Sequence, residues 1–159
     1  MKPFADHFSA LAGTYSVARP TYPPALFEWL ASTAPGRERA WDCAAGNGQA
    51  ARGLASCFAA VIATDASAAQ IARSPSNARV SRCVDLAEAS GLRDGSVQLV
   101  AVAQALHWLD LDAFYREARR VLVPRGVLAV WCYGLVHLND PAIDTLLQHL
   151  YRSVLGPYW

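Results

Sequence analysis

Short apolar runs alternate along this chain with segments whose apolar residues recur every three or four positions, and this alternation constrains the fold more than any other feature. Five apolar runs are typical of β-strands, at 39–43, 59–64, 79–84, 97–103 and 127–133. The run 97–103 is almost continuously apolar, as in a central strand that is covered on both faces. Strands that alternate with helices form βαβ units with right-handed crossovers. The sequence therefore predicts an α/β fold, a Rossmann-like doubly wound parallel sheet of about five strands with helices on both faces.

Helical spacing and helix-breaking residues define the segments between these runs. Helices are expected between Pro23 and Pro35, over 51–58, over 67–73, over 109–122, and from the N-cap Asp140 to Val154. Pro124, Arg125 and Gly126 are expected to form the turn that leads into the last strand.

Length, charge and cysteine content limit the class of protein. The 159 residues correspond to about one domain, expected over 1–159, with a cap and helix over 1–37 and the Rossmann-like core over 38–159. Fourteen basic and 13 acidic residues without a basic run argue against nucleic-acid or membrane partners. The absence of an apolar leader or a membrane-spanning run predicts a cytoplasmic protein. The four cysteines lack C-x-x-C spacing, which indicates reduced thiols and no metal site.

A glycine-containing turn follows the first strand, where doubly wound sheets bind their ligands. Gly46 and Gly48 allow the backbone to turn tightly and a ligand to approach closely. The alternative for these glycines is a tight turn without a ligand. Asp65 ends the second strand 17 residues after Gly48, and a carboxylate there can accept both hydroxyl protons of a ribose. The pattern favours a nucleoside ligand.

Two nucleoside ligands fit this pattern. Gly46-x-Gly48-x-x-Ala51 followed by Asp65 matches the dinucleotide fingerprint, which would indicate an NAD-dependent oxidoreductase. Asp42, expected at the mouth of the turn, would repel a pyrophosphate. S-adenosylmethionine instead presents an ammonium and a sulfonium group. The charge pattern therefore favours S-adenosylmethionine.

With these motifs the chain resembles the class I S-adenosylmethionine-dependent methyltransferases, and within them the small-molecule group known as type 11 or trans-aconitate-like. The resemblance covers nearly the whole chain. It is carried by Tyr15 with Arg19-Pro20, by the turn from Trp41 to Gln49, by Ala63 to Ser67, by Ala87-Glu88, by Gln104 to Trp108, and by Arg120 to Gly126.

The resemblance implies roles for individual residues, with S-adenosylmethionine as cofactor and S-adenosylhomocysteine as product. The cofactor-binding residues would be Asp42, Ala44, Gly46, Asn47, Gly48, Gln49, Asp65, Ala66, Ala87, Glu88, Gln104, Tyr15 and Arg19. In this set the backbone from Ala44 to Gly48 would lie against the methionine part and Asp65 would hold the ribose. Ala66 and the Ala87-Glu88 backbone would flank adenine, Gln104 would lie near the methionine end, and Tyr15 and Arg19 would close over the cofactor. His107 and Trp108 would face the acceptor.

Each of these side chains also has an ordinary structural interpretation. His107 would then be a hydrogen-bonded core histidine, Trp108 and Tyr15 packing residues, Glu88 a solvated surface acid, and Arg19 a helix cap or ion-pair partner.

The acceptor decides which residue would take part in methyl transfer. A hydroxyl or amine acceptor needs a general base, for which His107 is the candidate because its ordinary pKa lies near neutral pH. A carboxylate acceptor needs no base, and Arg19 would supply the opposite charge. A module that binds the cofactor without turnover is the second interpretation.

The chain departs from the family pattern in several places. Ala44 and Arg125 stand where glycine is usual, and Gln98 replaces an acid common at the start of the fourth strand. The family fold has seven strands, so the chain is expected to lack the last two and to be C-terminally truncated. The run 127–133 would then be an exposed apolar edge, which predicts a homo-oligomer through that edge or the last helix, or poor solution behaviour.

Overall fold

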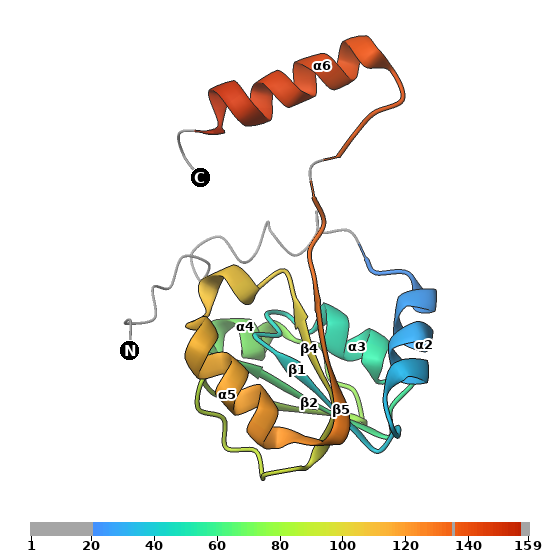
Figure 1. The fold of residues 1–159 in the computed structure, drawn as a ribbon, viewed down its shortest axis with the longest axis vertical. Coiled ribbons are helices and arrows are strands. Elements are labelled where there is room, and N and C mark those ends of the chain that lie inside the picture. Colours follow the sequence, from blue (N-terminus) through green and yellow to red (C-terminus); the bar gives the residue numbers. More distant parts are fainter. Residues whose placement is uncertain (1–20, 135, 157–159) are drawn as a thin grey trace.

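A computed structural model describes residues 21–134 and 136–156, and its core is a parallel β-sheet (Figure 1). The five strands of the sheet lie in the order β3-β2-β1-β4-β5. They are β1 (Arg39–Cys43), β2 (Ala60–Asp65), β3 (Val80–Val84), β4 (Val97–Ala103) and β5 (Leu122–Trp131). All four neighbouring pairs are parallel. The predicted doubly wound parallel α/β sheet is confirmed.

Of the five α-helices in the described residues, three begin at a residue whose side chain caps the helix: Ser67, Asp110 and Asp140. The five helices are α2 (Pro24–Thr33), α3 (Gln49–Leu54), α4 (Ala68–Arg73), α5 (Leu111–Val121) and α6 (Pro141–His149), with a 3-10 turn η1 (Leu106–Trp108) and a π-helical end η2 (Leu150–Val154). Asp140 caps α6 as predicted, because its carboxylate accepts hydrogen bonds from the N–H groups of Ala142 and Ile143.

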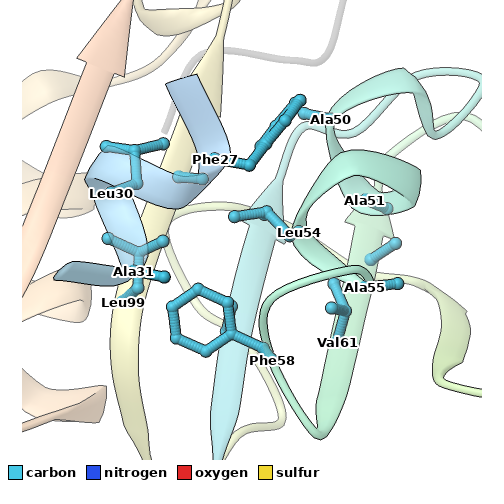
Figure 2. Close-up of a cluster of buried hydrophobic side chains, with 13 residues drawn as sticks. Phe27, Leu30, Ala31, Ala50, Ala51, Leu54, Ala55, Phe58, Val61 and Leu99 are labelled. Atoms are coloured by element: carbon cyan, nitrogen blue, oxygen red, sulfur yellow. The ribbon is translucent and has the colours of Figure 1, made fainter. Parts of the chain in front are cut away.

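One face of the sheet is covered by α2 and α3 (Figure 2). Phe27 and Leu30 of α2 pack against Leu54 of α3 and the following Phe58, all of them buried. The two helices approach closely because Gly53 has no side chain: a Cβ there would lie 2.0 Å from a ring carbon of Phe27. This packing fixes the helix that follows the glycine turn.

The opposite face is covered by α5. Phe114, Ala118 and Val121 of this helix form a buried cluster with Trp41 of β1 and with β4. The ring N–H of Trp41 also donates a hydrogen bond to Thr64 Oγ1 at 2.8 Å, which joins the carboxyl ends of β1 and β2. The strand ends that precede the glycine turn are therefore held from both faces.

Residues 124–126 were expected to form a turn, and this prediction is wrong in one respect. Strand β5 already begins at Leu122, which pairs with Val97 of β4, and the next pair is Leu99 with Val127. Residues 123–126 therefore form an irregular part of the strand, where the register of pairing with β4 shifts. Arg125 takes a φ of 65° there, a left-handed conformation that is strained for a residue with a side chain.

Replacing Arg125 by glycine should raise the free energy of unfolding by roughly 0.5 to 1 kcal/mol. The substitution removes roughly 1–2 kcal/mol of left-handed strain at an exposed position, and the added freedom of the unfolded chain offsets about 0.4–1 kcal/mol of the gain. Urea unfolding measures the difference. Arg125→Ala is the matched control, because it removes the same side chain but keeps the strained φ. Equal stabilisation by both variants would contradict the explanation.

Strand β5 is an edge of the sheet in the described part of the chain, and α6 lies apart from the sheet (Figure 1). The apolar residues of the last helical segment, Ile143, Leu146, Leu150 and Val154, are exposed, Leu146 by 69%. Their spacing puts them on one helix face. Association of two copies through β5 or α6 stays a prediction, and sedimentation of a monodisperse monomer would contradict it.

None of the helices in residues 21–134 and 136–156 has the length and apolar character that crossing a lipid bilayer requires.

Candidate functional site

The glycine turn lies at the carboxyl ends of the strands, between β1 and α3. The strand order reverses here, because β1 pairs with β2 on one side and with β4 on the other, and such a switch point is where doubly wound sheets bind ligands. Three residues of the turn have positive φ: Ala44 (53°), Gly46 (55°) and Gly48 (79°). Ala44 thus adopts a conformation that favours glycine, at a cost of about 1 kcal/mol.

The backbone N–H groups of the turn bind acceptors within the protein. Ala45 N–H donates to the Thr64 carbonyl at 2.8 Å, and Gly48 N–H to the Ala45 carbonyl at 2.9 Å. Gly46 N–H donates to Asp65 Oδ2 at 2.8 Å. A dinucleotide pyrophosphate binds to free N–H groups of such a turn. This arrangement therefore disfavours a pyrophosphate.

Asp65 links the turn to the end of β2. Besides Gly46, its carboxylate binds the N–H of Ser67 through Oδ1 at 2.8 Å. A carboxylate offers about four lone-pair sites, and each of the two Asp65 oxygens accepts one of these backbone N–H groups. The side chain is half-buried and lies at the switch point, where it can accept hydroxyl protons of a ligand.

Asp42 was expected at the mouth of the turn, and this prediction is wrong. Its side chain is 0% exposed, and neither carboxylate oxygen has a hydrogen-bond partner among the described residues. Burial, which the nearby Ala51 backbone partly offsets and the charge of Asp65 reinforces, raises the pKa of Asp42 to about 7. The charge at the turn that faces a ligand is therefore that of Asp65.

Several carboxyl groups lie around the end of β1. Burial raises the pKa of the neighbouring Cys43 thiol, and the charges of Asp42, Glu88 and Asp65 raise it further. Together with Glu117, these carboxyl groups act on one side chain at the end of β1. Such a site favours a cationic ligand.

Gln104 follows β4 in a left-handed conformation with a φ of 58°. Its N–H donates to the Trp131 carbonyl at 2.9 Å. The side-chain Nε2 of Gln104 is buried without a hydrogen-bond partner among the described residues, and so is the Nε1 of Trp131. Strained backbone and unsatisfied donors are typical of functional sites. Both donors lie on residues at the carboxyl ends of neighbouring strands.

The sequence analysis missed Trp131. Its ring meets that of Tyr22 edge-on, with centroids 5.5 Å apart. The available signal was its position, because an aromatic residue at the carboxyl end of a parallel strand lies at the edge where ligands bind.

The predicted adenine-side residues lie beside the end of β2. Asp85 N–H donates to the Asp65 carbonyl at 3.1 Å, which places the segment after β3 next to Asp65. Ala87 is buried, so mainly its backbone is available to a ligand. Glu88 is half-buried, and its Oε1 accepts a hydrogen bond from Asp110 N–H at 3.0 Å. The interpretation of Glu88 as a merely solvated acid is therefore wrong.

His107 and Trp108 form η1, directly after Gln104 and Ala105. Both side chains are exposed, and their ring centroids lie 4.8 Å apart. The interpretation of His107 as a buried core residue is wrong, because η1 presents it at the surface.

The remaining predicted site residues are only partly covered by the structure. Asn47, Gln49 and Ala66 are half-buried, in or next to the turns after β1 and β2. Tyr15 and Arg19 lie outside the described residues. Hydrogen bonds thus bring together the glycine turn, Asp65 and the start of the adenine-side segment. They also connect Gln104 with Trp131 and Glu88 with Asp110.

Comparison with known proteins gives a consistent result. A family model described as a methyltransferase domain matches residues 41–130. A Dictyostelium discoideum protein named as a methyltransferase is 36% identical over 159 residues, which cover 98% of this chain and 60% of that protein. A Saccharomyces cerevisiae protein named as an S-adenosylmethionine-dependent methyltransferase is 27% identical over 75% of this chain and 44% of its own length.

A solved structure shares the fold. The protein from Anaeromyxobacter dehalogenans described as a type II methyltransferase superposes with a TM-score of 0.81 and 45% identity, over 89% of this chain and 60% of that one. The chain thus spans about 60% of the length of these two similar proteins.

Proposed function

The chain belongs to the methyltransferase domain family, and from this premise we propose that it binds S-adenosylmethionine and transfers the methyl group to a small-molecule acceptor. The observation that carries the proposal is the Asp65 carboxylate, bound to the Gly46 N–H at the switch point of the sheet. It occupies a turn donor that a pyrophosphate would need, and it offers acceptors for a ribose. Together with the nearby Glu88 it favours a cationic ligand.

The polar groups of the site fit the parts of S-adenosylmethionine. Asp65 would accept the ribose hydroxyl groups, and the backbone of Ala87 and Glu88 would flank the adenine. The buried Gln104 Nε2, which lacks a partner among the described residues, suits the carboxylate of the methionine part. The Asp65 and Glu88 carboxylates, which lie near the end of β1, would suit its ammonium group. The cofactor would supply an activated methyl group.

The residues of the chain would act on the acceptor mainly by positioning it. Methyl transfer is an in-line displacement, so a bound acceptor in near-attack geometry accounts for much of the rate. The exposed His107 on η1 would accept the proton of a hydroxyl or amine acceptor, and Trp108 would pack against the acceptor. A carboxylate acceptor would need no base.

Calorimetric titration with S-adenosylmethionine, S-adenosylhomocysteine and NAD tests the proposal. We expect binding of the first two and none of NAD. Binding of NAD alone would contradict the proposal and favour the dinucleotide interpretation. Absence of binding by all three ligands would also contradict the proposal. An acceptor screen that follows methyl transfer then separates an enzyme from a module that binds the cofactor without turnover.

A further inference from the structure

The segment that carries the predicted adenine-side residues is attached to α5 near both ends of that helix. Near its carboxyl end, Glu117 Oε1 accepts hydrogen bonds from the N–H and the hydroxyl of Ser90, at 2.7 and 2.5 Å. Arg120 binds the same carboxylate and the Ser90 carbonyl. Near the amino end, Glu88 Oε1 accepts the N–H of Asp110 at 3.0 Å. The contacts of Glu117 and Arg120 with Ser90 already hold the segment against α5. The Glu88 contact is therefore not needed merely to attach it.

The Glu88 contact reaches the residue that joins η1 to α5. Asp110 is the N-cap of α5, where its carboxylate accepts the N–H of Ala113 at 3.2 Å. Directly before it, Trp108 N–H donates to the Ala105 carbonyl at 3.0 Å and Leu109 N–H to the Leu106 carbonyl at 3.1 Å. The Glu88 carboxylate therefore connects the segment at residues 87 and 88 with the turn that presents His107 and Trp108.

The two segments also share one buried cluster. Ala87 and Ala105 belong to it, and Leu106 and Leu109 pack against it. Protein interiors are close-packed, so a displacement of one segment changes the space available to the other. The two segments are thus joined by shared packing as well as by the hydrogen bond from Asp110 to Glu88.

We propose that Glu88 is a positioning residue that couples occupancy of the cofactor site to the position of the acceptor-facing turn η1. The proposal rests on the proposed function, since the adenine of the cofactor would lie against the backbone of Ala87 and Glu88. Contact with adenine fixes this backbone, the Glu88 carboxylate fixes the Asp110 N–H, and η1 takes one position. Cofactor binding would therefore raise the affinity for the acceptor. By linkage, an acceptor bound at η1 would raise the affinity for the cofactor by the same factor.

The test uses the full chain labelled with 5-fluorotryptophan, S-adenosylhomocysteine as the probe, and fluorine NMR as the readout. The Trp108 resonance is assigned with Trp108→Phe, and Trp29, exposed on α2, serves as the internal reference. Saturating probe should shift the Trp108 resonance of the wild type and leave that of Trp29 in place. In Glu88→Ala the shift at saturation should fall by more than half. Glu88→Gln should retain it, because the amide oxygen can still accept the Asp110 N–H.

Ser90→Ala is the matched control, because it removes a hydrogen bond from the same segment but leaves Glu88 intact. It should lower thermal stability and keep the Trp108 shift. If Glu88→Ala does not fold, Glu88→Asp replaces it, since the shorter side chain withdraws the carboxylate by one methylene group.

Three results would overturn the coupling: no Trp108 shift in the saturated wild type, a full shift in Glu88→Ala or Glu88→Asp, or an equal loss in Ser90→Ala. Calorimetry on the same samples distinguishes these from failure of the proposed function, in which the wild type does not bind the probe at all.

Discussion

Replacing Asp65 by alanine is expected to weaken S-adenosylmethionine binding by about ten- to a hundredfold. Hydrogen bonds to a charged group contribute roughly 1.5–3 kcal/mol each, and the variant loses the acceptors that would bind the ribose. It also frees the Gly46 N–H, which Asp65 holds at 2.8 Å, so the turn loses an anchor. Isothermal titration calorimetry of the folded variant measures the change.

A ligand control separates the ribose contact from loss of the turn anchor. An S-adenosylhomocysteine analogue without the ribose 2′- and 3′-hydroxyl groups should bind more weakly than S-adenosylhomocysteine to the wild type. The two ligands should bind Asp65→Ala with nearly equal affinity, because the variant has lost the carboxylate that the ribose hydroxyl groups would contact. Combining the protein variant with the ligand analogue thus isolates this direct contact, as in a double-mutant cycle. Glu28→Ala, at an exposed position on α2, should leave both affinities unchanged. Unchanged S-adenosylmethionine affinity in Asp65→Ala would refute the assignment.

Asp42 should make the protein less stable as the pH rises from 4 to 7. Its pKa lies near 3.8 in the unfolded chain and at about 7 in the folded protein, where burial disfavours the charged form. Between these values the folded state holds a proton that the unfolded state has released, so the free energy of unfolding falls with rising pH. At 1.36 kcal/mol for each pKa unit the loss is about 4 kcal/mol, complete just above pH 7.

Asp42→Asn should remove this contribution, because the amide stays neutral at every pH. Urea unfolding at pH 5 and pH 8 should give a smaller difference between the two pH values for the variant than for the wild type. The Asp42 carboxylate has no hydrogen-bond partner among the described residues, so the amide breaks no hydrogen bond with them. An identical pH dependence in both proteins would show that Asp42 is ionised in the folded state across this range.

Much of the fold could be predicted because it depends on local pattern. The apolar run 97–103 became β4, at the position predicted for it, since a strand covered on both faces needs apolar residues throughout. The start of strand β5 was harder to predict. Pro124 and Gly126 are turn residues by local preference, yet pairing of Leu122 with Val97 extends the strand past them. That pairing depends on a residue 25 positions away, which local spacing does not encode.

The candidate site likewise contains some residues that could be predicted from the sequence and others that only tertiary contacts reveal. The sequence located the glycine turn and Asp65, because their spacing relative to the strands puts them at one edge of a parallel sheet, and the family resemblance pointed to Gln104. It misplaced Asp42, whose exposure depends on how α3 covers β1, and it did not find Trp131 or the carboxylate contact of Glu88. These depend on contacts between segments that are distant in the chain.

The order of apolar and polar residues thus determined a parallel α/β sheet with a nucleoside-type turn after its first strand, because secondary-structure periodicity and glycine geometry are local properties. The tertiary structure alone decided which carboxylate is buried and neutralised, which accepts the turn N–H, and which bridges to α5. Burial and hydrogen-bond partners arise only when distant segments pack, and they set the charge that each acid presents to a ligand.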